Sequence, residues 1–431
     1  MLRIAVSGYY GFNNPGDEAI LLALVSTLKT LAPGVEITVF SHRPRETRQT
    51  YGVKAVNRWN PFSVLWAIWR SDLLLSGGGG LLQDVTGVRS IFYYLGIVLL
   101  AKILGRPVIY YAQGVGPVRT RIGRWLTRVI SNKVELITVR DEASREDFLK
   151  MGVTRPPVVV TADPVLALNP SHFSSEDGVA ILEKLRQECR EYGLSSGSEN
   201  SAGENPGGNT GENEEMPQGQ NCRSLGIVIR DWQDYQEFKR VVAAVADRLV
   251  DEGWEIVLVP FHFPLDLQPC REVAAMMRKP CLLVRSRLSV KELFSLLGKL
   301  DLVVGMRLHS LVIASVMRTP CVGISYDPKV ESFLELTGQP VAGTVADLEP
   351  EKLYQTIVST WEKRQEIVNH LDQLLVKMRQ QAWETTSLTL SVFYSQAPHR
   401  RGELKRRRRT TARSLTTESR KACLKKEKDT A

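Results

Sequence analysis

The sequence predicts an α/β protein with two Rossmann-like, doubly wound domains that face a cleft. Its 431 residues exceed what one hydrophobic core usually organises, so two domains are expected. Short apolar runs alternate with segments of helical pattern over residues 3–165, and the alternation resumes at Leu225. This alternation favours parallel sheets covered by helices on both faces, with binding loops at the carboxyl ends of the strands.

The first domain is expected over residues 1–170. Apolar, β-branched runs predict strands at Arg3–Gly8, Glu36–Phe40, Asp72–Ser76, Val108–Ala112, Leu136–Val139 and Val158–Thr161. The helical patterns between them predict helices at Asp17–Leu31, Pro61–Arg70, Ile91–Leu104, Ile122–Asn132 and Glu142–Met151.

The second domain is expected over residues 225–395. Its strands are predicted at Leu225–Ile229, Glu255–Pro260, Cys281–Val284, Asp301–Val304 and Cys321–Ser325. Its helices are predicted at Tyr235–Asp251, Ser289–Leu297, Leu308–Met317, Lys329–Leu336 and, as a long final helix, Glu349–Thr386. Ser289 and Glu292 have the spacing of a capping box, which marks a helix start.

Two polar segments complete the chain. Residues 171–224 are expected to form a linker, within which residues 195–221 hold five Glu and no Lys or Arg. Gly, Asn and Ser dominate this insertion, so it cannot bury enough apolar surface to fold. Residues 396–431 are expected to be a disordered basic tail.

The net charge of +9 lies in that tail. From Pro398 onward 13 Lys and Arg stand against 4 acidic residues, which is +9, so the preceding residues sum to zero. A nucleic-acid-binding surface on the folded part is therefore not expected. The tail is a candidate for contact with acidic lipid or polymer, and it lacks the interleaved aromatics of an RNA-binding segment.

Cysteine usage and the amino terminus favour a cytoplasmic protein, with association at the inner face of the plasma membrane as an option. The six Cys show no C-x-x-C and no paired spacing, which favours a reducing compartment. The chain starts directly with an expected strand, so no secretion signal is predicted. Ile91–Leu104 is too short and too aromatic for a membrane span. With Pro61–Trp69 it either rests on a membrane surface or, as we expect, packs as a core helix.

Gly305–Ser310, which reads Gly-Met-Arg-Leu-His-Ser, is the central candidate site. It connects an apolar run to a helical one, so its free backbone N–H groups and the helix dipole favour an anion. Arg307 adds a fork for carboxylate or phosphate, and His309 adds a group that exchanges protons near neutral pH. The alternative is a plain helix start with a surface Arg and a satisfied His.

Two glycine-containing loops follow strands of the first domain. The loop Tyr9–Glu18 lacks G-x-G-x-x-G, which disfavours a nicotinamide cofactor. Its Asp17 either caps the following helix or faces the cleft and binds a sugar hydroxyl. Gly77–Gly80 allows close approach of a ligand or backbone, but the Lys-Ser/Thr of a phosphate loop is missing. A tight turn is an equal alternative there.

Other polar residues follow further strands, where parallel sheets place their ligands. In the first domain they are Gln113–Pro117, Arg140-Asp141 and Asp163-Pro164, although a lone Arg-Asp pair is more often structural. In the second domain they are His262 and the group Arg230, Arg307, His309 and Lys329, and we expect this group of four to converge at one edge of the sheet.

Several motifs are absent from the sequence. Without D-x-D, a metal-dependent sugar-nucleotide transferase is not suggested. No Cys/His cluster suggests a metal, and no G-x-S-x-G suggests a hydrolase. We therefore expect no metal and no cofactor.

Six of these motifs, in this order, resemble the polysaccharide pyruvyl transferase family, most closely its CsaB type in bacterial cell-wall polymer synthesis. The resemblance spans roughly residues 1–390 apart from the insertion. It rests on Tyr10–Glu18, Gly77–Gly79, Gln113–Pro117, Arg140-Asp141, Asp163-Pro164 and Gly305–Ser310.

The resemblance implies a GT-B-like fold, phosphoenolpyruvate as donor and a lipid-linked saccharide, typically N-acetylmannosamine, as acceptor. The product would be a 4,6-linked pyruvate ketal. The first domain would hold the acceptor and the second the donor. The donor is expected to contact Arg140, Arg230, Arg307, Lys329 and Ser310. The acceptor side is expected to include Asn14, Gly78, Gly79, Gln113, Gly114, Asp163 and His262.

Ketal formation needs a proton on the vinyl carbon, attack by sugar hydroxyls and loss of phosphate. We expect His309, kept protonated by bound phosphate, to be the general acid, and Asp17 to be the base or orienter of the sugar hydroxyl. Two alternatives stay open: a GT-B glycosyltransferase with a nucleotide-sugar donor, and a glycan-binding protein without catalysis.

Overall fold

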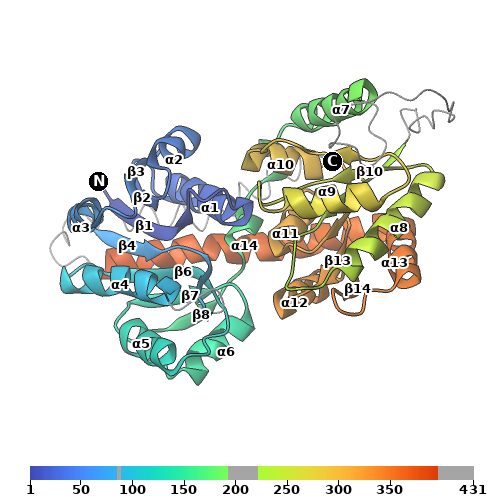
Figure 1. Ribbon diagram of the computed structural model, residues 1–431. Coiled ribbons are helices and arrows are strands. Elements are labelled where there is room, and N and C mark those ends of the chain that lie inside the picture. Colours follow the sequence, from blue (N-terminus) through green and yellow to red (C-terminus); the bar gives the residue numbers. More distant parts are fainter. Residues whose placement is uncertain (85–88, 193–221, 397–431) are drawn as a thin grey trace, which may run out of the picture. The chain divides into compact units, whose positions relative to one another are not determined.

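The computed structural model describes residues 1–84, 89–192 and 222–396, and it confirms an α/β fold with two parallel sheets (Figure 1). The predicted acidic insertion and basic tail lie outside the described residues. Met1–Thr386 form one compact unit, and from Ser387 the chain continues the last helix to Gln396.

The first sheet has the order β3-β2-β1-β4-β6-β7-β8, with β5 paired to β6. Its strands are β1 (Arg3–Tyr10), β2 (Glu36–Ser41), β3 (Lys54–Asn57), β4 (Leu73–Ser76), β5 (Gly79–Leu82), β6 (Val108–Val115), β7 (Leu136–Val139) and β8 (Val158–Val160). Its helices are α1 (Pro15–Leu31), α2 (Pro44–Tyr51), α3 (Pro61–Arg70), α4 (Arg89–Ile103), α5 (Arg121–Ser131) and α6 (Glu142–Lys150). The strand order reverses between β1 and β4, so the loops after these two strands lie where such sheets bind ligands.

The second sheet has the order β11-β10-β9-β12-β13-β14, which is the 3-2-1-4-5-6 order of a Rossmann fold. Its strands are β9 (Arg223–Val228), β10 (Trp254–Leu258), β11 (Leu282–Leu283), β12 (Leu302–Gly305), β13 (Cys321–Ser325) and β14 (Val341–Thr344). The surrounding helices are α7 (Ser175–Tyr192), α8 (Glu237–Asp251), α9 (Leu267–Met276), α10 (Val290–Leu297), α11 (Leu308–Val316), α12 (Pro328–Thr337), α13 (Pro350–Glu362) and α14 (Arg364–Gln396).

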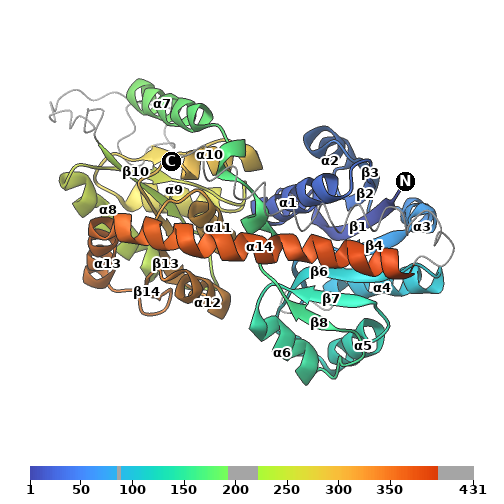
Figure 2. The same ribbon diagram turned by 180° about the vertical axis from the view of Figure 1, so that it is seen from behind.

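One hydrophobic core joins the two sheets. It combines residues of α1 with residues of α11, α14 and the short 3₁₀ helix η1 (Pro164–Ala167), which lies ahead of a second one, η2 (Pro170–His172). The long helix α14, seen along its length in Figure 2, returns to the first sheet. There Thr386 bonds to Thr27 and Tyr111, and Thr385 bonds to Thr161. The amino-terminal ends of α1, η1 and α11 are thereby held close together.

The structure differs from the sequence-based elements where a segment is short or polar. The pair α2 and β3 was not expected, because α2 buries only Thr47 and Tyr51. The helices α7 and α9 and the strand β14 were also not expected. The last two glycines of Gly77–Gly80 open strand β5, and Gln113 to Val115 extend β6. The single helix expected from Glu349 is two helices, which separate at Lys363.

Candidate active site

The imidazole of His309 lies at the centre of the candidate site. His309 stands in the first turn of α11, and its Nε2 is 3.4 Å from Oδ2 of Asp163. This is an ion-pair distance, although the ring nitrogen makes no well-aligned hydrogen bond. The other oxygen of Asp163 caps η1 by accepting the Val165 N–H at 3.1 Å. The site therefore joins a side chain of the second sheet to a carboxylate of the first.

The opposite edge of the His309 ring packs against the start of α1. A Cβ atom added at Gly16 would lie 2.4 Å from Nδ1 of His309, so only glycine fits here without displacing the ring. Gly16 belongs to the loop from which the family resemblance was argued, and its role is to admit the imidazole.

Arg140 supplies the nearest fixed cation. Its Nη1 lies 3.1 Å from Oδ2 of Asp163, and only 8% of its side chain is exposed. The guanidinium rests on Gly114, where a Cβ atom would lie 2.9 Å from Nε. Burial raises the pKa of Asp163, but the nearby charges of His309 and Arg140 outweigh burial and hold it well below its usual range. Asp163 is thus a carboxylate at any working pH.

Asp17 is the second buried carboxyl of the site. Its Oδ2 accepts a bond of 2.6 Å from Nδ2 of Asn14, which also caps α1. Gly79, with a φ of +99°, brings its backbone against Oδ1, at 2.8 Å from the position of a Cβ atom. Burial and the neighbouring Glu18 raise the pKa of Asp17 to about 8, with Arg140 opposing the shift. Asp17 is therefore mostly protonated at neutral pH.

Lys329 brings an unpaired positive charge to the site. It lies in the first turn of α12, where its backbone N–H bonds to Asp327 at 2.9 Å. Within the described residues its ammonium has no hydrogen bond or ion pair. Burial lowers the pKa of Lys329, and the charge of Arg140 lowers it further. The positive charges of Lys329 and Arg140 repel each other, so an anionic ligand bound between them would be attracted by both.

Arg307, expected to grip the donor, already has a partner. Its Nε donates to Oδ2 of Asp266 at 2.9 Å, its Nη2 donates to Oδ1, and Asp266 is buried. Ser310 is fully buried, and its hydroxyl donates to the Arg307 carbonyl at 2.6 Å. In this structure the Arg307 fork and the Ser310 hydroxyl are both engaged within the protein.

Arg230 and His262 line the second sheet's side of the site. The Arg230 guanidinium stacks on Tyr326 and Trp232, at 5.1 and 5.3 Å from their ring centroids. No carboxylate pairs with it among the described residues. His262 Nε2 lies 3.4 Å from the carbonyl oxygen of Phe12, across the two halves of the chain. Burial and the charge of Arg307 lower the pKa of His262, so this ring is neutral at physiological pH.

The predicted glycines and Gln113 shape the backbone beneath Asp17. Gln113 is fully buried, and its Nε2 donates to the carbonyl oxygens of Gly79 and Gly114 at 2.7 and 3.0 Å. A Cβ atom at Gly78 would lie 3.1 Å from Ile20. These residues fix the loop between β4 and β5, and the buried side-chain Oε1 of Gln113 has no hydrogen-bond partner.

Comparisons with known proteins identify the family of this chain. A family model described as polysaccharide pyruvyl transferase matches residues 14–328. The chain belongs to the polysaccharide pyruvyl transferase family. That stretch includes Asp17, Arg140, Asp163 and His309 of the candidate site, and it ends one residue before Lys329.

The chain is also similar to individual proteins. The chain is 22% identical over 285 residues to the amylovoran biosynthesis protein AmsJ of Erwinia amylovora, an alignment that covers 62% of this chain and 60% of that relative. Among solved structures, Anabaena HepE in complex with UDP-glucose matches 91% of this chain and 100% of its own, with TM-score 0.57 and 13% identity. A putative UDP-N-acetylglucosamine 2-epimerase from Listeria monocytogenes matches 86% of this chain and 91% of its own, with TM-score 0.58 and 12% identity. At such identities these structures establish a shared GT-B-like fold and nothing further.

In this member of the pyruvyl transferase family, Arg58 is a buried cation that was not predicted from the sequence. Only 5% of it is exposed, its Nη1 donates to the Gly8 carbonyl at 2.9 Å, and its Nε has no partner. The guanidinium lies 4.3 Å from the Tyr93 ring centroid and 4.9 Å from that of Phe12. Its positive charge opposes the rise in the pKa of Asp17, so the guanidinium lies near the site. An Arg followed by Trp59 carries no local signal of burial, so only the fold reveals it.

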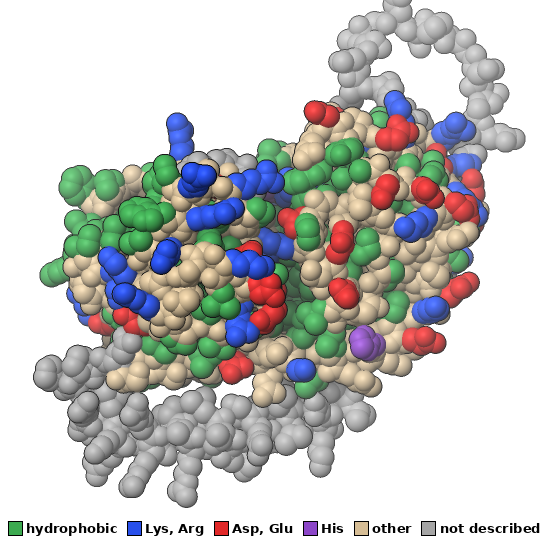
Figure 3. All heavy atoms as spheres, turned by 90° about the horizontal axis from the view of Figure 1, so that it is seen from below, with side chains coloured by type: hydrophobic (Ala, Val, Ile, Leu, Met, Phe, Trp, Pro, Cys, Tyr) green, Lys and Arg blue, Asp and Glu red, His purple; other side chains and the backbone are tan. Residues whose placement is uncertain are grey.

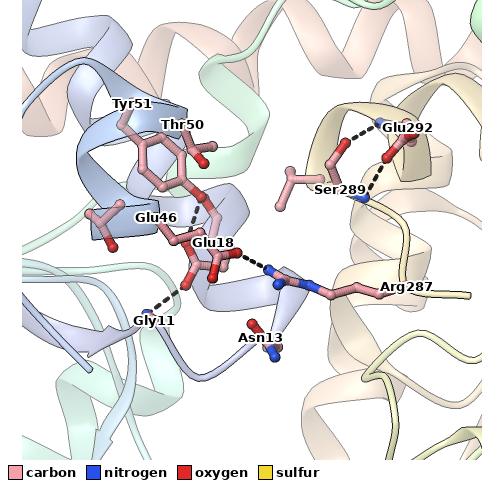
Figure 4. A pocket seen from close by; sticks show the side chains of 11 residues that line it. Gly11, Asn13, Glu18, Glu46, Thr50, Tyr51, Arg287, Ser289 and Glu292 are labelled. Atoms are coloured by element: carbon pink, nitrogen blue, oxygen red, sulfur yellow. Dashed lines mark hydrogen bonds and ion pairs between the residues drawn. The ribbon is translucent and has the colours of Figure 1, made fainter. Parts of the chain in front are cut away.

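A separate cavity of about 270 Å³ opens beside the loop after β1 (Figure 4). Glu18 stands in it, accepting bonds from the Gly11 N–H at 2.7 Å and the Tyr51 hydroxyl at 2.5 Å. An ion pair of 2.6 Å between Glu46 and Arg287 crosses it. Neither His309 nor Asp163 lines this cavity, so it is distinct from the cluster described above.

Proposed function

We propose that this protein transfers pyruvate from phosphoenolpyruvate to a sugar of a lipid-linked cell-wall polysaccharide precursor. The product is a 4,6-pyruvate ketal, and phosphate is released. The proposal rests on one observation above all: a member of the pyruvyl transferase family assembles Arg140, Asp163, His309 and the unpaired Lys329 where its two sheets meet. We further propose that the protein is of the CsaB type and that the acceptor sugar is N-acetylmannosamine.

The donor's charge selects its contacts. Phosphoenolpyruvate carries a carboxylate and a phosphate, which suit Arg and Lys side chains. Lys329 and Arg230 have no carboxylate partner among the described residues, and Arg140 shares its charge with Asp163. We assign donor binding to these three cations. Arg307 supports the site from its ion pair with Asp266.

His309 is assigned as the acid. Oδ2 of Asp163 lies 3.4 Å from its Nε2, which is an ion-pair distance for the protonated ring that the proposal requires. Transfer of this proton to C3 of phosphoenolpyruvate leaves a cationic C2, which a sugar hydroxyl attacks. The C2–O bond to phosphate then breaks, and the second hydroxyl closes the ketal. Of the two hydroxyl protons, one restores His309 and the other leaves with phosphate or solvent.

For Asp17, expected on sequence grounds to be the base or the orienter of the sugar hydroxyl, the raised pKa favours the second role. With a pKa of about 8 it carries a proton at neutral pH and can donate a hydrogen bond to the sugar. Its carboxylate form, which could accept a hydroxyl proton, becomes the major one only above that pH. We therefore assign Asp17 to orienting the acceptor, with a base role that grows as the pH rises.

The test is a transfer assay with purified full-length protein. Lipid-linked N-acetylmannosamine disaccharide is incubated with phosphoenolpyruvate or with UDP-sugars, and product mass and released phosphate are measured. A mass gain of pyruvate minus water, with one phosphate released per ketal, supports the proposal. A hexose-sized gain from a UDP-sugar overturns it in favour of a glycosyltransferase. Binding of the acceptor without any transfer favours a glycan-binding protein.

The relative AmsJ suggests a second acceptor for the same assay. AmsJ is an amylovoran biosynthesis protein, and the present chain spans about 60% of its length. An exopolysaccharide repeat unit on its lipid carrier is therefore included beside the cell-wall precursor. Ketal formation on the repeat unit alone would retain pyruvyl transfer and replace the cell-wall acceptor.

A further inference from the structure

Three helices on one side of the first sheet share an unusual composition. The helices α3, α4 and α5 follow one another across the sheet, α4 contacts both of the others, and all three pack on one hydrophobic core. None of the three contains an Asp or Glu, while together they carry Arg70, Arg89, Lys102, Arg121, Arg124 and Arg128. Lys102 is paired with Glu135, and the five Arg are exposed.

The outer surfaces of the same helices are apolar and aromatic. Phe62, Trp66 and Trp69 of α3 are 80%, 55% and 59% exposed. Phe92 of α4 is 50% exposed, and Trp125 of α5 is 60% exposed. In Figure 3 hydrophobic and Lys/Arg side chains intermingle on the left, the side on which Figure 1 places these helices. Burial in the core, which the sequence favoured for Pro61–Trp69, holds for only one face of α3: Val64, Ala67 and Ile68 are buried.

This combination is typical of a surface that lies on a membrane. Trp and Phe insert at the level of lipid headgroups, and Arg on the same face attracts anionic lipid. Arg70 illustrates the pattern, since its guanidinium stacks 4.7 Å from the Trp66 ring centroid and remains exposed. Among the described residues no helix is both long and apolar enough to cross a bilayer, so such a contact would be peripheral.

We propose that the exposed face of α3, α4 and α5 docks on an anionic lipid bilayer. Charge decides between the possible occupants. A second copy would oppose five Arg with five Arg, and the chain's own tail adds 13 Lys and Arg against 4 acidic residues. Both would repel this face, whereas anionic headgroups attract it. The proposal stands apart from pyruvyl transfer, although a lipid-linked acceptor would lie in the same bilayer.

Flotation with vesicles tests this docking in the full-length protein. Vesicles of phosphatidylglycerol and phosphatidylcholine are compared with phosphatidylcholine alone. Each substitution removes the apolar area of an inserted aromatic ring, so Phe62→Ser and Trp66→Ser should each weaken partitioning about tenfold or more, which corresponds to about 1.4 kcal/mol or more. Leu336→Ser is the matched control, because Leu336 is 56% exposed on α12. Thermal unfolding of each variant reports whether it folds.

Three outcomes are distinguished. Loss of binding in Phe62→Ser and Trp66→Ser, with Leu336→Ser unchanged, supports the proposal. Binding that survives both substitutions but disappears when Lys405–Arg409 are replaced by Gln assigns the membrane contact to the tail and overturns it. Absence of binding to anionic vesicles at low salt also overturns it and leaves a protein partner as the occupant.

Discussion

At the residue scale, two buried carboxyls in one site have pKa values displaced in opposite directions. Asp163 faces His309 and Arg140 and is ionised, whereas Asp17 is buried beside Glu18 and has a pKa of about 8. Such divergence separates a group that stabilises positive charge from one that carries a proton. The difference between the two pKa values arises from the surroundings of each carboxyl, because the two residues have the same side chain.

The His309→Ala variant tests the assignment of the acid. General acid catalysis contributes roughly 10²–10⁴-fold, so kcat for ketal formation should fall by about that factor. His172→Ala is the control, because His172 is exposed on η2. The turnover of both variants is measured at saturating phosphoenolpyruvate, together with Tm. An active His309→Ala enzyme would remove His309 from the mechanism.

The pKa of Asp17 predicts a pH-dependent effect on stability. A carboxyl whose folded pKa is raised keeps its full stability contribution below the unfolded value of 3.8 and loses it as the pH rises through about 8. Asp17→Asn removes that loss, so the variant should gain Tm over the parent at pH 8 and gain little at pH 4. The exposed Asp234→Asn serves as control. An equal gain at both pH values contradicts the raised pKa.

At the scale of elements, the sequence predicted what depends on local pattern. The two runs of alternating strands and helices, and the loops after β1, β4, β9, β12 and β13, follow from apolar periodicity and glycine. The partner of Arg307 could not be predicted, because Asp266 lies 41 positions away and forms the pair only when β10 and β12 flank β9. For the same reason the proximity of His309, Asp163 and Arg140 required the fold, although each residue had been singled out.

The start of α1 offers a test of how closely elements must approach. Gly16→Ala places a methyl group 2.4 Å from Nδ1 of His309, so the ring must move away from Asp163. We expect kcat to fall by at least about tenfold, since small misplacements of a catalytic group cost up to about 10²-fold. Gly96→Ala in α4, where a Cβ atom meets nothing within 4 Å, is the control and should retain activity. Unchanged kcat in Gly16→Ala would show that the ring position tolerates a shift.

At the scale of the whole molecule, the candidate donor site draws its cations from both sheets. Arg140 follows β7 of the first sheet, while Lys329 follows β13 of the second. A ligand that binds only when both are in place stabilises the folded protein by mass action, by about 2.7 kcal/mol at a concentration of 100 Kd.

Phosphoenolpyruvate should therefore raise Tm, and Lys329→Met should abolish the rise because an unpaired ammonium is replaced by an apolar side chain. Lys291→Met, at an exposed position of α10, should retain it. Without ligand, Lys329→Met should be at least as stable as the parent, since burial disfavours the charged ammonium. An equal ligand-induced shift in both variants would place phosphoenolpyruvate away from Lys329 and leave the cation cluster without its proposed anion.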